Sequence, residues 1–229
     1  MNTSDKDNNE LINYLLGFVT PERWSRFNNV ITNRTRHLTV VIENVFQPHN
    51  ISAVLRSCEC FGLQDVHIID KNNYFEINTE IELGASKWLN INLYNDENQN
   101  NTIKCIESLK TEGYRVIATS PHINDCNLDE LNIDNKTALI FGKELEGLSE
   151  DAKEMADGFM KIPMYGFTES FNISVTAALC MHHITSKLRD SSVSWKLSEQ
   201  EKAEVLINWL KKSIKNSEMI IKQFFEKKQ

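Results

Sequence analysis

The sequence predicts an α/β domain whose mainly parallel sheet is covered by helices on both faces, with helical extensions at both ends of the chain. Between residues 37 and 188, short apolar runs typical of strands alternate with longer segments of helical periodicity. A mainly parallel sheet is covered by helices on both faces. Strands that alternate with helices indicate parallel neighbours connected through those helices.

The predicted elements of this domain follow one another without a long interruption. Strand signals occupy residues 37–43, 65–70, 87–94, 114–120, 137–142 and 158–164. Helix signals occupy residues 49–61, 101–113, 149–156 and 172–188. The helix from residue 101 is expected to end at Gly113, because glycine readily adopts the left-handed conformation that closes a helix.

Helices are also predicted on either side of the domain. Pro21 suits the first helical position, with Thr20 as the N-cap and Glu22 in the first turn. Ser198, followed three residues later by Glu201, forms a capping-box pattern at the start of a lysine-rich helix. The predicted organisation is therefore a helical extension at 1–37, an α/β domain at 38–190 and a basic helical extension at 191–229.

The composition argues against several classes of protein. No apolar run reaches the roughly 18 residues that a membrane span needs, and the first residues lack the features of a signal peptide. Five cysteines without a CxxC pair, and no cluster of His and Cys, argue against a disulfide framework or a zinc site. We therefore expect a cytoplasmic protein that binds neither a membrane nor a metal.

The net charge of −7 conceals an uneven distribution. Residues 1–42 hold five Lys or Arg against four Asp or Glu, residues 43–186 hold ten against twenty-two, and residues 187–229 hold ten against six. Within the first part, segment 23–37 has four arginines, no acidic residue and two aromatic residues between the arginines. Such a segment can bind a phosphate backbone and stack on bases, but it also suits a solvated helix face. The distribution is compatible with a nucleic acid that runs over the two ends of the chain.

The residue that stands out in the predicted domain is Arg56, in "QPHNISAVLRSCECFG". Four apolar residues recur at helical spacing and should face the core: Ile51, Val54, Leu55 and Cys58. Arg56 shares its face with the small residues Ser52 and Ala53, and helical side chains lean toward the helix start. With Asn50 as a candidate N-cap, the guanidinium would lie near free backbone N–H groups, an arrangement that binds anions. The segment alone leaves an ordinary exposed arginine equally possible.

A second segment, "LIFGKELEGLSED", places Gly142, Lys143 and Glu144 directly after a strand, where α/β proteins bind ligands. It is not a phosphate-binding P-loop, because GxxxxGK[ST] is missing and the neighbouring acidic residues would repel phosphate. We expect Gly142 to let the backbone approach a ligand and Glu144 to hydrogen-bond a donor. The alternative is a plain turn.

A third segment, "KIPMYGFTESFNISVTAALCMHH", runs from a strand through a loop to a helix opened by Ser170 and Asn172. Both are common capping residues, yet with Phe171 between them they are also compatible with a pocket that contacts a ligand. The chain has no HExxH, no GxSxG and no defensible set of nucleophile, histidine and acid. A hydrolase is therefore not indicated.

In order and spacing, "ENVFQPHNISAVLRSCECFGLQDVHII", "LIFGKELEGLS" and "IPMYGFTESFNISVTAAL" resemble the three motifs of the SpoU (SPOUT-class) RNA 2′-O-methyltransferases. The resemblance covers about residues 20–190. The "HNISAVLR" form and the short helical ends are similar to the branch that methylates the D-loop guanosine at position 18 of tRNA. Methylation of rRNA or of another tRNA position is an alternative, as is a non-catalytic RNA-binding protein of the same fold.

The resemblance implies a SPOUT-type fold with a C-terminal trefoil knot, a homodimer, S-adenosylmethionine as cofactor and tRNA as partner. It implies a catalytic set made of Arg56, Asn50, Glu144, Ser170 and Asn172. It implies cofactor contacts from Thr119, Gly142, Ile162, Met164 and Phe171. On the basis of charge, the candidates for RNA contact are Arg23, Arg26, Arg34, Arg36, Lys211 and Lys212.

The chemistry of this reaction suits Arg56. Methyl transfer from a sulfonium is an in-line displacement that needs alignment and a nucleophilic ribose hydroxyl, but neither a metal nor a covalent enzyme intermediate. Because the pKa of arginine exceeds about 12, Arg56 is a poor base. We expect it to hold an RNA phosphate, orient the hydroxyl and stabilise the negative charge that develops. Proton removal by a deprotonated Arg56 is the alternative, and the sequence leaves it open.

Overall fold

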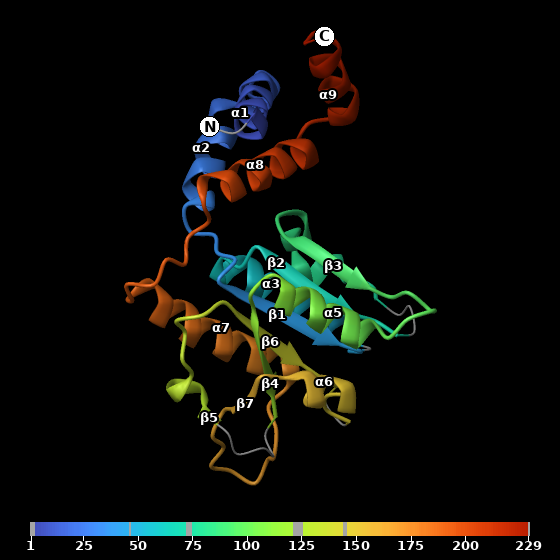
Figure 1. The fold of residues 1–229 in the computed structure, drawn as a ribbon, viewed down its shortest axis with the longest axis vertical. Coiled ribbons are helices and arrows are strands. Elements are labelled where there is room, and N and C mark those ends of the chain that lie inside the picture. Colours follow the sequence, from blue (N-terminus) through green and yellow to red (C-terminus); the bar gives the residue numbers. More distant parts are fainter. Residues whose placement is uncertain (1–2, 46, 72–74, 121–125, 144–145, 229) are drawn as a thin grey trace. The chain divides into compact units, whose positions relative to one another are not determined.

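The computed structural model describes residues 3–45, 47–71, 75–120, 126–143 and 146–228 of the chain. The chain forms two compact units, one made of Thr35–Trp195 and the other of Met1–Arg34 together with Lys196–Gln229 (Figure 1). The two extensions that the sequence analysis treats separately thus contribute to the same unit.

The larger unit contains a parallel sheet. Its strands are β1 (Leu38–Glu43), β2 (Asp65–Ile69), β3 (Asn90–Tyr94), β4 (Arg115–Thr119), β5 (Cys126–Asn127), β6 (Thr137–Phe141) and β7 (Gly158–Lys161). Within the described residues they form one seven-stranded sheet in the order β3-β2-β1-β6-β4-β7-β5, with every pairing parallel. The predicted α/β fold with a mainly parallel sheet is confirmed, and only the two-residue β5 lacks a counterpart in the prediction.

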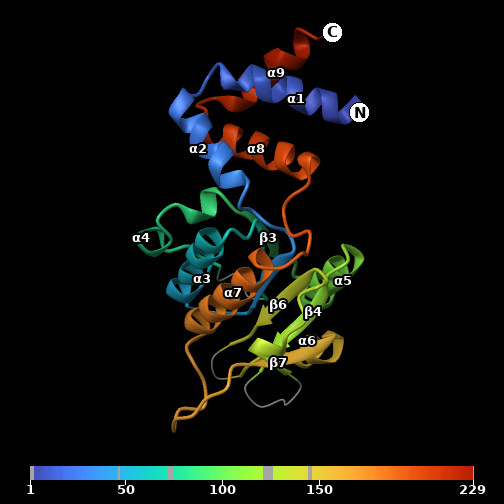
Figure 2. The same ribbon diagram turned by 90° about the vertical axis from the view of Figure 1, so that its left-hand side faces the viewer.

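Helices cover both faces of this sheet. α3 (Pro48–Phe61) and α7 (Ile173–Arg189) pack side by side on one face, and α5 (Asn101–Thr111) and α6 (Glu150–Met155) cover the other (Figure 2). In β1, Val40 and Ile42 belong to the apolar core shared with α3 and α7, whereas Val41 belongs to the core shared with α5 and α6. All six residues of β1 are buried, which explains why its sequence does not alternate between polar and apolar residues.

The start of α3 differs from the prediction. The helix begins at Pro48 with Gln47 in the N-cap position, so the predicted N-cap role of Asn50 is wrong. Proline is favoured at the first helical position because its φ is already helical and the N–H that it lacks would have no helical partner. Asn50 instead lies in the first turn, where its side-chain amide donates to Gln47 Oε1 at 2.6 Å. At the other end, Gly62 closes α3 with φ of +85°.

Three short helical elements in the described part of the chain were not expected from the sequence. They are α4 (Thr79–Glu82), η1 (Ala85–Lys87) and η2 (Leu128–Glu130). α4 and η1 pack against α3, so the segment between β2 and β3 lies over the helix that carries Arg56.

The second unit is helical. It contains α1 (Thr3–Leu16), α2 (Pro21–Ile31), α8 (Glu199–Ser213) and α9 (Ser217–Glu226). The N-cap predicted at Thr20 is confirmed by a hydrogen bond from Arg23 N, and the capping box of Ser198 and Glu201 by its two reciprocal bonds. α1 lies inside the predicted helical extension, in which only α2 was located from the sequence. The predicted C-terminal helix is interrupted before Asn216, which has φ of +57°.

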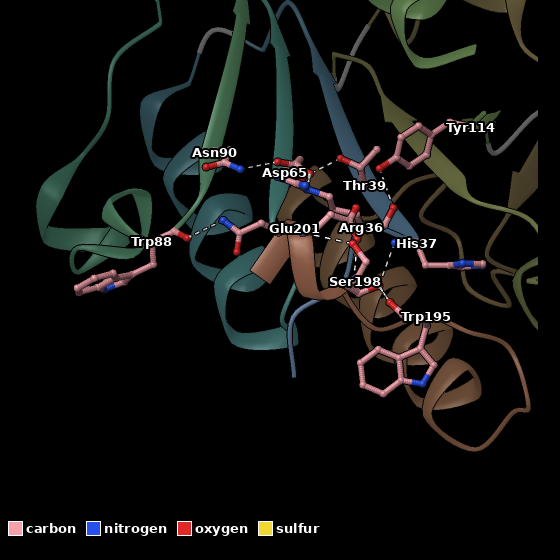
Figure 3. Close-up of polar contacts among 12 residues, drawn as sticks. Arg36, His37, Thr39, Asp65, Trp88, Asn90, Tyr114, Trp195, Ser198 and Glu201 are labelled. Carbon is pink, nitrogen blue, oxygen red and sulfur yellow. Dashed lines mark hydrogen bonds and ion pairs between the residues drawn. The ribbon is translucent and has the colours of Figure 1, made fainter. Parts of the chain in front are cut away.

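The first and last residues of the larger unit are joined to each other. Thr35 Oγ1 donates to the carbonyl of Trp195 at 2.5 Å. Next to Thr35, Arg36 Nε forms an ion pair with Asp65 at 2.8 Å, and Asn90 Nδ2 donates to the same carboxylate at 2.7 Å (Figure 3). Asp65 and Asn90 begin β2 and β3, so both chain connections leave the unit at the amino-terminal edge of the sheet.

Candidate active site

Three of the predicted cofactor contacts follow neighbouring strands. Thr119 ends β4, Gly142 follows β6 and Ile162 follows β7, and these strands are adjacent in the order β6-β4-β7. Because the strands are parallel, their carboxyl ends meet at one edge of the sheet, the edge at which α/β folds bind ligands. Thr119 Oγ1 donates to the carbonyl of Ile140 at 2.9 Å, which ties its hydroxyl to the neighbouring strand.

The glycine after β6 allows a close approach, but by the protein's own backbone. A Cβ on Gly142 would lie 2.4 Å from the carbonyl carbon and oxygen of Gly147. Lys143 and Gly147 exchange two backbone hydrogen bonds of 3.0 Å, which close the loop on itself. The contact with Gly147 accounts for the glycine at this position, and the approach of a ligand to the backbone of Gly142 stays a prediction. Glu144 lies outside the described residues.

The first and third motifs meet through two asparagines. Asn172 Nδ2 donates to Asn50 Oδ1 at 3.1 Å, across 122 positions of sequence. Asn50 is 3% exposed and also bonds Gln47 in the first turn of α3, while Asn172 is the N-cap of α7 and accepts from Ser174 N at 2.9 Å. Asn172 is therefore a helix cap, as the simpler interpretation has it, and at the same time a link between α3 and α7.

Arg56 lies on the exposed side of α3. Its Nη1 donates to the carbonyl of Ile81 in α4 at a long 3.4 Å, and among the described residues it forms no ion pair. The segment that supplies this carbonyl is fixed to α3 by the backbone N–H of Asn78, which donates to Ser52 Oγ at 2.7 Å. The guanidinium is held by one weak contact and keeps its charge available to a ligand.

The loop between β7 and α7 carries the remaining candidates. Ile162 and Met164 are half-buried, whereas Ser170 and Phe171 are exposed. Tyr165 and Phe167, which the sequence analysis did not single out, are almost fully exposed at 96% and 109%. The signal that could have identified them is "MYGF", in which aromatic residues flank a glycine inside a loop.

The six candidates for RNA contact fall into two groups. Arg23 and Arg26 on α2, and Lys211 and Lys212 on α8, are exposed. Arg34 is 1% exposed, and its guanidinium carbon lies 5.3 Å from the centre of the Trp209 ring, so its burial contradicts the predicted RNA contact. Arg36 is 21% exposed and paired with Asp65.

The aromatic residue Phe27 is also unavailable for stacking on bases. It is buried, and its ring centre lies 5.5 Å from that of Trp209, on the other helix of the pair α2 and α8. A tryptophan ring that contacts both a phenylalanine and a guanidinium stabilises the packing of the helices.

Two kinds of site have no support in the described residues. No group of three or more His, Cys, Asp or Glu could hold a metal ion there. None of the described helices is long and apolar enough to cross a membrane.

Comparison with known families finds a family to which the parallel α/β sheet and the three motifs near its carboxyl edge belong. The chain belongs to the SpoU rRNA methylase family, whose model matches residues 37–182. It is 41% identical over 216 residues to the tRNA (guanosine(18)-2′-O)-methyltransferase of Borreliella burgdorferi, covering 94% of this chain and 97% of that protein. It is 32% identical over 198 residues to the protein of the same name from Thermus thermophilus, covering 84% and 98%.

A solved structure has the same fold. The TrmH/SpoU tRNA modifying enzyme of A. aeolicus matches with a TM-score of 0.76 at 27% identity, over 85% of this chain and 98% of that one. The likeness therefore extends beyond the segment that the family model covers.

Proposed function

We propose that this protein transfers a methyl group from S-adenosylmethionine to a ribose 2′-OH of tRNA, at the guanosine in position 18 of the D-loop. The relatives from B. burgdorferi and T. thermophilus, at 41% and 32% identity, are named for this reaction. The observation in the structure that carries the proposal is the hydrogen bond between Asn172 and Asn50. It joins the first and third motifs, which the resemblance assigns to one catalytic site.

The residues after β6 and β7 fit an adenosyl group. Ile162 and Met164 are half-buried and offer apolar contacts, and the backbone at Gly142 offers polar groups without a side chain. Apolar surface with a few fixed backbone polar groups is the usual environment of such a ligand. AviRb of Streptomyces viridochromogenes, a SpoU methyltransferase of the same fold (TM-score 0.56, 19% identity), has been solved in complex with AdoMet. When bound, this cofactor supplies an electrophilic methyl group on a sulfonium.

Arg56 would hold the RNA. An arginine side chain offers a permanent positive charge, and the 3.4 Å contact of Arg56 to the Ile81 carbonyl is weak enough to be exchanged for a phosphate. A phosphate held in this way fixes the adjacent ribose and helps to stabilise negative charge on the reacting oxygen. Ser170 and Asn172, with Glu144, would complete the catalytic set that the resemblance implies.

The terminal unit would supply the wider RNA contact. Its exposed cations on α2 and α8 are Arg23, Arg26, Lys211 and Lys212. Phosphate contacts of this kind contribute affinity and orientation, while the catalytic site selects the nucleotide. A tRNA substrate and the free cysteines support a cytoplasmic location.

A second copy of the chain would cover an apolar stripe of α7. Val175 and Leu179 are spaced four residues apart on α7 and are 45% and 42% exposed, and Phe171, just before the helix, is 44% exposed. Two helical residues at this spacing share one face, and exposed apolar patches mark interfaces. We expect a homodimer in sedimentation analysis, converted toward monomer by Val175→Asp. A monomeric unmodified chain would contradict this assembly.

We further propose that the segment that ends in α7 forms a trefoil knot. The order of the strands, with β6 between β1 and β4, and the likeness to a TrmH/SpoU structure support it. Tracing the backbone in an experimental density map tests it, and an unthreaded path from β6 to α7 would overturn it.

The first experiment is transfer of a labelled methyl group from S-adenosylmethionine to unmodified tRNA transcripts, with the modified nucleotide mapped. We expect a label at guanosine 18, lost with Arg56→Ala and kept with Lys104→Ala. Lys104 is an exposed cation on α5, the helix that covers the other face of the sheet, and serves as a matched control. Label at another tRNA position or only in rRNA would change the target. Cofactor binding without transfer to either RNA would favour the non-catalytic alternative.

A further inference from the structure

Glu43 is a buried carboxylate that the proposed chemistry does not use. It is the last residue of β1, the first residue of the first motif, and 1% exposed. Among the described residues it has no ion pair, but it accepts three hydrogen bonds: from Thr102 Oγ1 at 2.7 Å, Ser149 Oγ at 2.6 Å and Ser149 N at 2.9 Å. Burial of a carboxylate costs free energy unless hydrogen-bond donors are held in place around it. The three donors to Glu43 meet this requirement.

The donors come from two elements with different roles. Thr102 lies in the first turn of α5 and has no part in the three motifs. Ser149 is the last residue of the second motif and the N-cap of α6, where its Oγ also accepts from Ala152 N at 3.2 Å. Two of the three hydrogen bonds to Glu43 therefore fix the point at which the loop 142–148 ends.

The other end of the same loop is fixed by the same strand. β6, which precedes the loop, pairs with β1, with Phe141 opposite Ile42. The loop thus leaves the sheet one residue before Glu43 in register and returns to the carboxylate of Glu43. β1 holds both ends, one through the sheet and the other through this side chain.

Between these ends, the described residues Gly142, Lys143 and Gly147 are held closely together. Gly142 contacts Gly147 so closely that a Cβ would lie 2.4 Å from its carbonyl, and Lys143 and Gly147 exchange two backbone hydrogen bonds. A shift of Ser149 would therefore be passed through Gly147 to Gly142, whose backbone is the expected cofactor contact. Tight packing transmits such displacements rather than absorbing them.

We propose that Glu43 is a positioning residue for cofactor binding: through Ser149 it sets the positions of Gly147 and Gly142. The inference rests on the proposed function, because it takes the backbone of Gly142 as part of the S-adenosylmethionine site. Glu43 acts only through the loop and touches neither the methyl group nor the RNA.

The test is calorimetric titration of S-adenosylmethionine into the full chain and four variants. We expect Glu43→Ala to raise the Kd by about tenfold or more, since it leaves the N–H of Ser149 without its acceptor. Glu43→Gln keeps an acceptor oxygen and should rescue most of the affinity, leaving a loss of about threefold. Ser149→Ala, which removes the hydroxyl but keeps the N–H, should also lose about threefold.

Thr102→Val is the matched control, because it removes a hydrogen bond to the same carboxylate from outside the loop. It should lower the melting temperature without changing the cofactor Kd, and the tRNA Kd should stay unchanged in all four variants. A purely structural role of Glu43 predicts that Thr102→Val and Ser149→Ala lose equal amounts of cofactor affinity, and that result would overturn the inference.

The outcomes separate this inference from the proposed function. If the unmodified chain binds no S-adenosylmethionine, the proposed function fails, and the inference fails with it. If the unmodified chain binds it and a folded Glu43→Ala binds equally well, the positioning role is wrong and the proposed function stands. Should Glu43→Ala fail to fold, the comparison of Ser149→Ala with Thr102→Val decides.

Discussion

Arg56 in the α/β unit and Arg34 in the helical unit use the same side chain in opposite ways. Arg56 is exposed and held by a single long contact to a carbonyl, whereas Arg34 is buried against the ring of Trp209. Both stand in segments whose local sequence suggests an anion site. The difference lies in the neighbour that tertiary packing supplies. Arg56 contacts a carbonyl that a ligand can replace, whereas Arg34 contacts an aromatic ring that stays in place.

The largest expected effect concerns Arg56. Its replacement by Ala should lower kcat/KM for methyl transfer by about 10²–10³-fold, the scale of a lost charge-stabilising contact. The melting temperature should barely change, because the side chain is exposed. A large fall in melting temperature would place Arg56 with Arg34, as a structural residue.

Arg56→Lys distinguishes the phosphate contact from the role of base. A phosphate contact predicts partial activity with an unchanged pH profile, because lysine keeps the charge but lacks the bidentate geometry. A base predicts that the profile moves to lower pH, since lysine loses its proton near 10.4 and arginine only above about 12. Initial rates between pH 6 and 10 measure the difference.

The next effect extends the comparison to a buried imidazole, His67 in β2. Burial lowers its pKa from 6.5 to about 4, so it is held neutral in the fold. The unfolded chain binds a proton near pH 6.5 and the folded chain only near pH 4. The stability that the neutral ring contributes is therefore complete above pH 6.5 and is lost as the pH falls toward 4, by about 3 kcal/mol in all.

Urea unfolding at pH 7.5 and pH 5 measures this dependence. His67→Gln should be less stable at pH 7.5 but should lose less stability on acidification than the unmodified chain. Equal losses in the two proteins would show that His67 does not control the pH dependence.

A smaller effect is expected from Arg34. Arg34→Ala should lower the free energy of unfolding by about 2 kcal/mol, because a desolvated cation–π contact with Trp209 is lost. Arg23→Ala, on the exposed side of the neighbouring helix, should change it by less than about 0.5 kcal/mol. If Arg34→Ala leaves stability unchanged and weakens tRNA binding instead, the contrast between the two arginines collapses.

The smallest effects are those of the single exposed cations of the helical unit. Each of the four Ala substitutions, at Arg23, Arg26, Lys211 and Lys212, should weaken tRNA binding a few-fold. Each should also reduce the dependence of log Kd on log salt concentration by about 1. Lys104→Ala should leave that dependence unchanged. Titrations at several salt concentrations provide the measurement, and unchanged slopes in all four variants would remove the helical unit from the RNA path.

The parallel sheet could be predicted from the sequence because its determinants are local. The alternation of apolar runs and helical periodicity reports burial on both faces, and β1 shows the pattern in six consecutive residues. The capping box at Ser198 is likewise a signal carried by four neighbouring residues. Asn50 was placed wrongly because two local signals competed, and Pro48 determined the helix start.

The parts that escaped prediction depend on residues distant in sequence. Arg34 is buried because Trp209, 175 positions later, lies against it. The site pairing of Asn50 with Asn172 spans 122 positions. In the sequence, Glu43 is only the last residue of a predicted strand, and its proposed role depends on hydrogen bonds from the distant Thr102 and Ser149. Periodicity reports which face a residue shares, not which residue it meets.

The hydrogen bond between Thr35 and the carbonyl of Trp195 has a consequence for how this protein can be cut and recombined. It joins Thr35 and Trp195, the two residues at which the chain passes to the helical unit. The two connections to that unit therefore leave the α/β unit next to each other. Removing residues 196–229 alone would strip Trp209 from Arg34 and Phe27 and leave a damaged half-unit. Removing both terminal segments together, or exchanging both with those of a relative, treats the helical unit as one interchangeable cassette.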